Sequence, residues 1–212
     1  APTTKAHTVR QATLIALDWG TSNLRASLLD AGGIAIDTRS APGGVMAVQG
    51  GRFAEALLAL CGDWITQHDC PLIASGMVGS RQGWCEALYR TVPCTPLDRA
   101  SQVMAPVTDP RLKVAIAPGL KQVSPADVMR GEETQIAGAL RLMPGYDGVF
   151  CLPGTHSKWV HVSAGEVVSF QTFMTGEMFA LLSEASVLRH GMQGGGWDEA
   201  AFVGDDLADV PV

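Results

Sequence analysis

The chain carries two groups of short apolar runs, and each group predicts three consecutive β-strands. The runs are bounded by Gly, Asp and Asn, which is typical of strands joined by tight turns. The early runs lie at 14–17, 24–29 and 33–38, and the late runs at 149–152, 159–162 and 166–173. The same pattern in two places indicates a duplicated architecture.

Elsewhere the spacing of apolar residues predicts three helices. Apolar residues recur at helical intervals over 53–68. A second helix is predicted over 127–143, where Pro144 follows as a stop signal. For the third helix we expect Thr175 to be the N-cap. The residues expected on its inward face are Phe179, Leu182 and Ser186.

The order of these elements predicts an α/β fold in two lobes. We expect a first lobe over 12–126, an interlobe helix over 127–145 and part of a second lobe over 146–212. The second lobe has fewer predicted elements than the first, so we expect the chain to be cut short there. An incomplete lobe would expose apolar surface, through which we expect the protein to associate, for example as a homodimer.

The composition of the chain limits the classes of partner and the cell compartment that we expect. The 212 residues carry a formal net charge of −6 and no basic run, so nucleic acid is not an expected partner. Charged residues, Gly or Pro interrupt every apolar run, so no membrane span is expected. The five cysteines are odd in number and lack C-x-x-C spacing, which disfavours a disulfide framework and structural zinc. These features favour a cytoplasmic protein.

The turn after the first predicted strand offers several hydrogen-bond donors. Gly20 permits close approach to the backbone, and the next three residues supply polar groups for phosphate: Thr21, Ser22 and Asn23. Asp18, at the end of the strand, can hold Mg²⁺ beside bound phosphates. Arg25 can place positive charge near a transferred group. The alternative is an ordinary hairpin with a polar turn.

A second turn of the same kind follows the strand at 149–152. Gly154 and Thr155 match the first turn, and His156 and Lys158 are further candidates for contact with phosphate. A lone lysine on a strand more often faces solvent. Two such turns favour a duplicated fold that holds a polyphosphate from both sides, and therefore a kinase.

Two carboxylates lie between these turns, at Glu132 and Glu133. They follow Gly131 in the first turn of a helix, where the helix dipole favours a carboxylate and is expected to keep it ionised. An ionised carboxylate in a cleft can accept a proton from a sugar hydroxyl. The alternative is a pair of surface glutamates stabilised by the helix start.

Five segments together resemble the 2-dehydro-3-deoxygalactonokinase family. They are DWGTSNLRA at 18–26, GMVGS at 76–80, VMRGEETQ at 128–135, LPGTHSKWV at 152–160 and MTGE at 174–177. The resemblance implies the actin-like ATPase (ribonuclease-H-like) fold of two lobes. It also implies transfer of the γ-phosphate of ATP to the 6-hydroxyl of 2-dehydro-3-deoxy-D-galactonate, with Mg²⁺, in galactonate catabolism.

The resemblance also implies roles for individual residues. The first turn resembles the phosphate-1 motif, with Asp18 near Mg²⁺, and the second turn resembles phosphate-2. Glu132 is the expected general base, with Glu133 as the alternative. The residues expected to contact the substrate are Ser80, Arg81, Gln82, Trp84, Arg130 and Glu177. Of these, Arg81 or Arg130 is expected to bind the sugar-acid carboxylate. For Trp84, the alternative is a packed aromatic.

Two other classes of function share these features. A non-catalytic, sugar-binding regulator on the same fold would keep both turns and need no general base. A kinase for another sugar or sugar acid would differ around 76–84 and 174–177. An inactive truncated fragment would keep the motifs without turnover.

Overall fold

The computed structural model describes residues 11–191. These residues form two compact units. The first unit contains 11–152 and 158–172, and the second contains 153–157 and 173–191. Each unit is described by itself.

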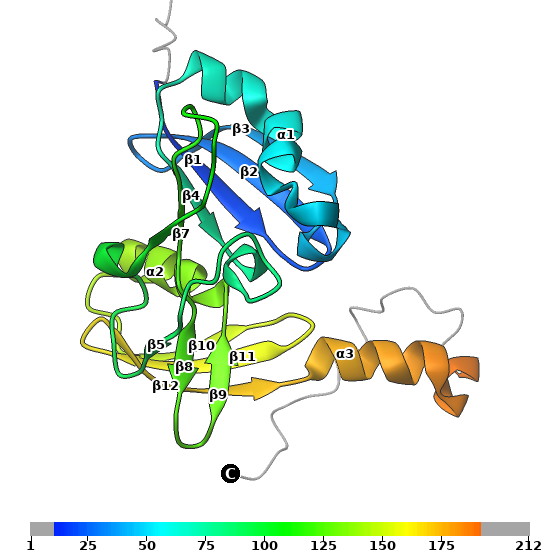
Figure 1. The fold of residues 1–212 in the computed structure, drawn as a ribbon. Coiled ribbons are helices and arrows are strands. Elements are labelled where there is room, and N and C mark those ends of the chain that lie inside the picture. The colour runs from blue at the N-terminus through cyan, green and yellow to red at the C-terminus, as the bar shows by residue number, and fades with distance from the viewer. Residues whose placement is uncertain (1–10, 192–212) are drawn as a thin grey trace, which may run out of the picture. The chain divides into compact units, whose positions relative to one another are not determined.

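A six-stranded mixed sheet forms the N-terminal part of the first unit (Figure 1). Its strand order is β3-β2-β1-β4-β7-β6. The three N-terminal strands form an antiparallel meander, whereas β4 and β7 run parallel to β1. The strands are β1 (Ala12–Trp19), β2 (Asn23–Asp30), β3 (Ala35–Pro42), β4 (Leu72–Ser75), β6 (Val103–Met104) and β7 (Val114–Ile116). The three strands predicted early in the chain are confirmed, and the third runs over Ala35–Pro42 where 33–38 was predicted.

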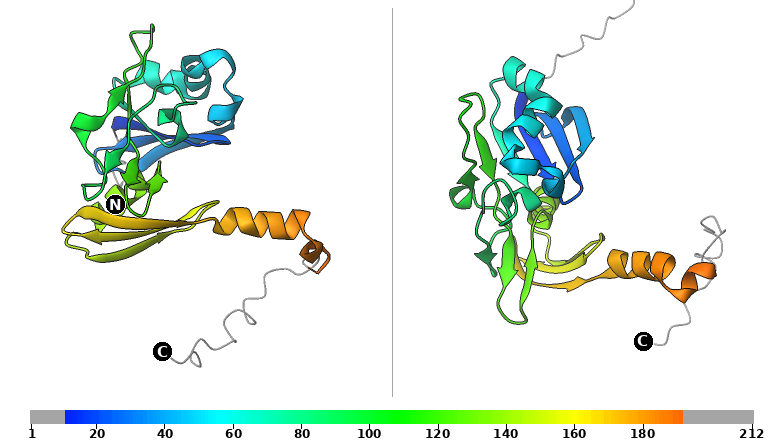
Figure 2. Two further views of the ribbon diagram at one scale, coloured as in Figure 1. Left: turned by 60° about the horizontal axis from the view of Figure 1, so that its bottom comes forward. Right: turned by 45° about the vertical axis from the view of Figure 1, so that its right-hand side comes forward.

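Helix α1 (Phe53–Gln67) covers one face of this sheet, as both views of Figure 2 show. Its apolar residues fall at helical spacing on one side, so they are removed from water together with the apolar face of the strands. The buried helix residues are Phe53, Leu57, Cys61, Trp64 and Ile65. The helix predicted from this spacing is confirmed. None of the helices in residues 11–191 is both long and apolar enough to cross a membrane.

Arg39 on β3 ties the sheet to α1. Its Nη1 and Nη2 donate to the two carboxylate oxygens of Asp63 at 2.5 and 2.7 Å, and its guanidinium lies 4.3 Å from the centroid of the Trp64 ring. The hydrogen bonds from Arg39 lower the pKa of Asp63 to about 2. Asp63 is therefore ionised in the folded protein at neutral pH and pairs with Arg39.

We expect Asp63→Asn to remove part of the acid sensitivity of the fold. A folded-state pKa below the ordinary value means that the carboxylate stabilises the fold above about pH 4, and that this stabilisation is lost as the pH falls toward 2. Urea unfolding at a series of pH values measures this. The free energy of unfolding should decline more steeply with acidification in the parent than in Asp63→Asn, and equal slopes would contradict the expectation.

Two smaller sheets complete the first unit around a second apolar core. One has the order β5-β8-β9, formed by β5 (Arg90–Thr91), β8 (Leu120–Gln122) and β9 (Asp127–Met129). The other has the order β10-β11-β12, formed by β10 (Gly148–Leu152), β11 (Ser157–Ser163) and β12 (Glu166–Phe173). Helix α2 (Glu132–Leu142) contributes Ile136 to the core. The core residues are Leu120, Met129, Ile136, Val160, Val162, Val167 and Phe170.

The predicted helix over 127–143 begins later than expected. Residues 127–129 form β9, which pairs with β8, and α2 starts at Glu132. The reason is Gly131, whose φ of +110° interrupts the helical path. The prediction is therefore wrong for 127–131 and confirmed for the rest of the helix.

The second unit contains α3 (Thr175–Ala180), followed by short turns of π-helix (Leu181–Ala185) and 3₁₀-helix (Val187–His190). The predicted N-cap is wrong, because Met174 occupies that position and no side chain caps the helix. The predicted inward face is also wrong, since Phe179 is 63% exposed and Leu182 is 39% exposed. None of the described residues of α3 is buried. The other 3₁₀ turns, all in the first unit, are Val45–Ala47, Gln49–Gly51, Met77–Gly79 and Arg99–Ser101.

Candidate active site

Three segments that are distant in the sequence meet beyond the carboxyl ends of β1 and β4. These parallel strands are in register, with Asp18 opposite Ser75. Gly76 follows with a φ of +92°, and a Cβ there would lie 2.9 Å from the carbonyl oxygen of Trp19. A Cβ on Gly131 would lie 3.4 Å from the Cα of Gly76. The start of α2 is therefore held at the sheet edge where open α/β sheets bind ligands.

The β1–β2 turn presents unoccupied donors. The Gly20 N–H donates to the Asn23 carbonyl at 3.0 Å, which closes the turn. Within the part of the chain that the structure describes, the N–H groups of Thr21 and Ser22 make no hydrogen bond. The side chains of Thr21, Ser22 and Asn23 are exposed. Such a turn can bind an anion through its backbone N–H groups.

Gly44, for which the sequence predicts no role at the site, packs against this turn. A Cβ on Gly44 would lie 2.2 Å from the carbonyl carbon of Thr21 and 2.3 Å from the nitrogen of Ser22. The neighbouring Gly43 N–H donates to the Ser22 carbonyl at 3.1 Å. The sequence shows only a Gly-Gly pair, which indicates a loop and gives no sign of this packing.

Asp18 and Arg25 face each other across β1 and β2. Their register pairs them, and Arg25 Nη1 lies 3.4 Å from Asp18 Oδ2. Both side chains are more than half exposed, so this ion pair contributes little to stability and leaves both groups available to a ligand. The described residues contain no group of three or more His, Cys, Asp or Glu placed to hold a metal ion. A single carboxylate fits Mg²⁺ that is held mainly by phosphate oxygens and water.

The two glutamates of α2 differ in environment. Glu132 is partly exposed, and its Oε2 accepts the Arg130 N–H at 3.0 Å. Glu133 is 0% exposed, and its Oε2 accepts the Gly131 N–H at 2.7 Å. Burial raises the pKa of Glu133 to about 7. The expectation that the helix dipole keeps both carboxylates ionised is therefore wrong for Glu133, because desolvation outweighs the dipole.

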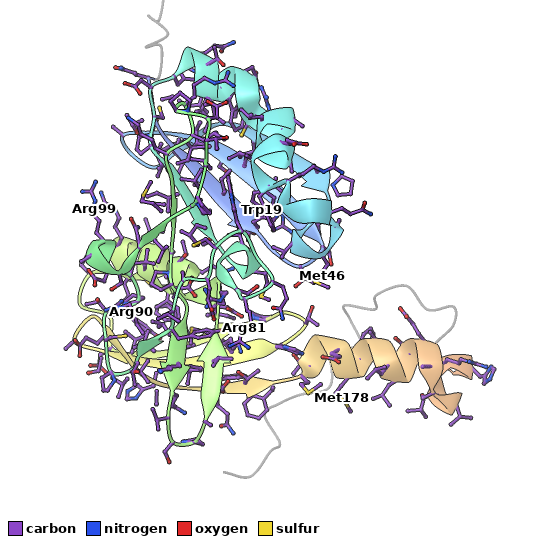
Figure 3. The ribbon with its side chains drawn as sticks, viewed as in Figure 1. Trp19, Met46, Arg81, Arg90, Arg99 and Met178 are labelled. Atoms are coloured by element: carbon purple, nitrogen blue, oxygen red, sulfur yellow. The ribbon has the colours of Figure 1, made fainter. Side chains whose placement is uncertain are left out.

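The loop after β4 carries several of the predicted substrate residues. Arg81 and Gln82 are exposed, whereas Ser80 is only 7% exposed and its hydroxyl has no partner among the described residues. Figure 3 labels Arg81 on this loop and Trp19 between the sheet and α1. Trp84 stacks on Phe53 with ring centroids 5.9 Å apart. The structure therefore shows Trp84 in the packed aromatic role.

Arg130 precedes the glutamates and is held in a fixed position. Its guanidinium lies 4.2 Å from the centroid of the Tyr89 ring, and Nη2 donates to the Ala87 carbonyl at 2.8 Å. A Cβ on Gly79 would lie 2.8 Å from Nη1. Nε and Nη1 are buried without a partner among residues 11–191. A buried cation with unpaired donors favours an anionic partner.

The predicted second phosphate turn lies in the second unit. The Gly154 N–H donates to Ser157 Oγ at 3.4 Å, and the Gly154 carbonyl accepts the Gly176 N–H at 3.2 Å. The Thr155 carbonyl accepts the Glu177 N–H at 3.0 Å. Glu177 was expected to contact substrate, but its Oε2 lies 2.5 Å from His156 Nε2. The turn at residues 154–156 and the start of α3 are therefore hydrogen-bonded to each other.

Lys158 has a structural environment. It is 6% exposed, and its Nζ donates to the Val128 carbonyl at 2.7 Å and to Thr172 Oγ1 at 2.6 Å. Thr172 Oγ1 in turn donates to Asp127 at 2.7 Å. The expectation of a solvent-facing lysine is wrong. These contacts do not favour a phosphate-binding role, because the ammonium is already enclosed by protein acceptors.

The sheet order, in which an antiparallel β3-β2-β1 meander continues into the parallel strands β4 and β7, defines a ribonuclease-H-like lobe of the actin-like ATPase fold. A family model described as 2-keto-3-deoxy-galactonokinase matches residues 18–205. The chain belongs to this family, and the resemblance inferred from the motifs is confirmed.

Individual relatives agree with this assignment. The chain is 38% identical over 181 residues to the 2-dehydro-3-deoxygalactonokinase of Escherichia coli (strain K12), covering 84% of this chain and 59% of the relative. It is also 38% identical over 178 residues to a Rhizobium meliloti (strain 1021) protein named "Probable 2-dehydro-3-deoxygalactonokinase DgoK1", covering 82% of this chain and 58% of the relative.

A solved structure confirms the fold. It is that of a Sinorhizobium meliloti protein assigned as a 2-dehydro-3-deoxygalactonokinase, with a TM-score of 0.71 at 34% identity. The match covers 84% of this chain and 59% of that chain. The chain thus spans less than two thirds of the length of these relatives.

Proposed function

We propose that the protein transfers the γ-phosphate of ATP to the 6-hydroxyl of 2-dehydro-3-deoxy-D-galactonate, in galactonate catabolism in the cytoplasm. Family membership supports the substrate class. The observation that carries the proposal is the close approach of Gly131 to Gly76 and of Gly76 to Trp19. It brings a helix start with two carboxylates to the strand end from which a donor-rich turn projects.

The first unit supplies groups for phosphoryl transfer. The N–H groups and hydroxyls of Thr21 and Ser22 bind phosphate oxygens, and Asp18 would hold Mg²⁺, which would neutralise phosphate charge. Glu132 accepts the proton of the 6-hydroxyl while the hydroxyl oxygen attacks the γ-phosphorus. The bond between the γ-phosphorus and the β-phosphate oxygen then breaks, and ADP is released. Arg25 stabilises the charge on the transferred group.

The second unit is assigned the matching phosphate contact. Gly154 and Thr155 are the proposed phosphate-2 residues, supported by the repeat of the glycine–threonine turn. The lobe boundaries at 126 and 146 and association as a homodimer remain predictions of the same proposal.

We assign Arg130 to the substrate carboxylate in preference to Arg81. The unpaired Nε and Nη1 of Arg130 support this, as does the unpaired hydroxyl of Ser80, which follows the Gly79 that lies against Nη1, whereas Arg81 is exposed. A charge-assisted hydrogen bond from a guanidinium to a carboxylate is stronger than one to a neutral hydroxyl, so a sugar acid suits this position better than a neutral sugar.

Arg130→Met is expected to raise KM for the sugar acid by about 10- to 100-fold, because a charge-assisted pair is lost. Steady-state kinetics measure this, with thermal unfolding to verify that the variant is folded. Arg81→Met is the matched control, with a change in KM below about threefold. If Arg81→Met has the larger effect, the carboxylate role belongs to Arg81.

A coupled assay of ADP release tests the function. ATP is offered with 2-dehydro-3-deoxygalactonate, its gluco epimer, galactonate or galactose, or without a sugar. Release with 2-dehydro-3-deoxygalactonate above all others supports the proposal. Release with another acceptor indicates a kinase of different specificity, and no release with any acceptor favours the regulator or an inactive fragment.

A further inference from the structure

Glu133 makes its contacts entirely within the protein. It is 0% exposed in the first turn of α2. Its Oε2 accepts the Gly131 N–H at 2.7 Å, and its Oε1 accepts the Thr134 hydroxyl at 3.3 Å. Both oxygens of this enclosed carboxyl group are therefore engaged by protein donors, and these contacts argue against Glu133 as the general base.

Glu133 accepts a hydrogen bond from the N–H of Gly131, and Gly131 sets the direction in which α2 begins. Gly131 has a φ of +110°, and its carbonyl accepts the Thr134 N–H at 3.2 Å. The same residue lies against Gly76 at the end of β4. The conformation of Gly131 therefore sets the angle at which α2 leaves β9, and with it the position of Glu132, the next residue.

We propose that Glu133 is a positioning residue, whose buried carboxyl group holds the Gly131 N–H and thereby fixes the Glu132 carboxylate at the ends of β1 and β4. This inference rests on the proposed function, in which Glu132 is the base. It assigns the adjacent glutamates separate tasks, one toward the substrate and one toward the backbone.

Thr134 makes this arrangement tolerant of protonation. Burial raises the pKa of Glu133 to about 7, so both protonation states are populated near neutral pH. The Thr134 hydroxyl can donate to an ionised carboxylate or accept from a carboxylic acid. The remaining oxygen accepts the Gly131 N–H in both states. The turn is therefore held whether or not Glu133 is charged.

The tolerance leads to a specific test with Glu133→Gln, which keeps an acceptor for the Gly131 N–H and a donor for Thr134. We expect kcat within about fivefold of the parent for Glu133→Gln, because the turn is preserved. Glu133→Ala removes the acceptor, and we expect kcat to fall by about 30-fold or more with KM for the sugar acid changed less than about threefold. The exposed Gln135→Ala in the same helix is the matched control, with unchanged kinetics.

Hydrogen exchange at the Gly131 amide reports the same contact without turnover. We expect the parent and Glu133→Gln to protect this amide equally, and Glu133→Ala to exchange about tenfold faster or more. This readout separates the two proposals, because a parent that phosphorylates no sugar acid defeats the function while leaving the Gly131 contact measurable.

Three results would overturn the inference. The first is a Glu133→Gln variant as inactive as Glu132→Gln, which would make Glu133 the base. The second is a Glu133→Ala variant with parental kcat. The third is a Gly131 amide whose exchange is unaffected by Glu133→Ala. If Glu133→Ala does not fold, Glu133→Gln and its exchange rate still decide the question.

Discussion

Replacing Glu132 by Gln should lower kcat by about 10²- to 10⁴-fold, the range typical for removal of a general base. The amide keeps the size of the side chain and can still accept the Arg130 N–H, but it cannot accept a proton from the 6-hydroxyl. KM for ATP should change little, because the proposed phosphate contacts lie on the β1–β2 turn. The measurement is initial-rate kinetics with 2-dehydro-3-deoxygalactonate and ATP varied separately.

Glu55→Gln is the matched control for this change. Glu55 also lies in the first turn of a helix, but it is 70% exposed and is 3.9 Å from Arg52 on the surface of α1. Its replacement should leave kcat unchanged. A kcat of Glu132→Gln within a few-fold of the parent would show that Glu132 is not the general base. The proposed phosphoryl transfer would then need another proton acceptor.

Gly44→Ala should displace the β1–β2 turn, to which phosphate binding is assigned in the proposed function, and raise KM for ATP by about tenfold or more, at a cost of about 1–3 kcal/mol in the free energy of unfolding. The added Cβ would lie 2.2 Å from the Thr21 carbonyl carbon and 2.3 Å from the Ser22 nitrogen. These are backbone atoms, so no change of rotamer relieves the clash. The backbone at Gly44, with a φ of −64° and a ψ of −174°, is open to any residue, and the effect is therefore steric.

Gly138→Ala is the control for Gly44→Ala. Gly138 lies inside α2, and an added Cβ would have no atom within 4 Å. Alanine favours the helix over glycine, so this variant should gain about 0.5–1 kcal/mol in the free energy of unfolding without change in KM. Denaturant unfolding and nucleotide titration measure both effects. A Gly44→Ala variant with parental KM for ATP would show that the turn tolerates displacement or binds no phosphate.

Family membership and the unpaired donors of Arg130 support two different aspects of the proposed function, the reaction and the choice of substrate. The family supports the proposed reaction, and Arg130 is the residue proposed to distinguish an acid from a neutral sugar. The Arg130→Met and Glu132→Gln variants separate these parts, because one should act on KM and the other on kcat.

The sequence by itself determined the elements whose signals are local. The β1–β2–β3 meander, α1 and the turn at Thr21 follow from alternation, helical spacing and turn residues, which act between neighbours in the chain. The motif pattern also determined the family. The position of α2 was only partly predictable, since the effect of Gly131 depends on its backbone angle and on the pairing of β9 with β8.

Only the tertiary structure decided which polar groups are enclosed. Adjacent glutamates with identical chemistry differ because α2 turns Glu133 into the protein and leaves Glu132 partly exposed. Lys158 is enclosed by acceptors from distant strands, and Gly44 packs on a turn more than twenty residues earlier. Burial, pKa and steric contact depend on residues brought together across the chain, and spacing along the sequence does not contain that information.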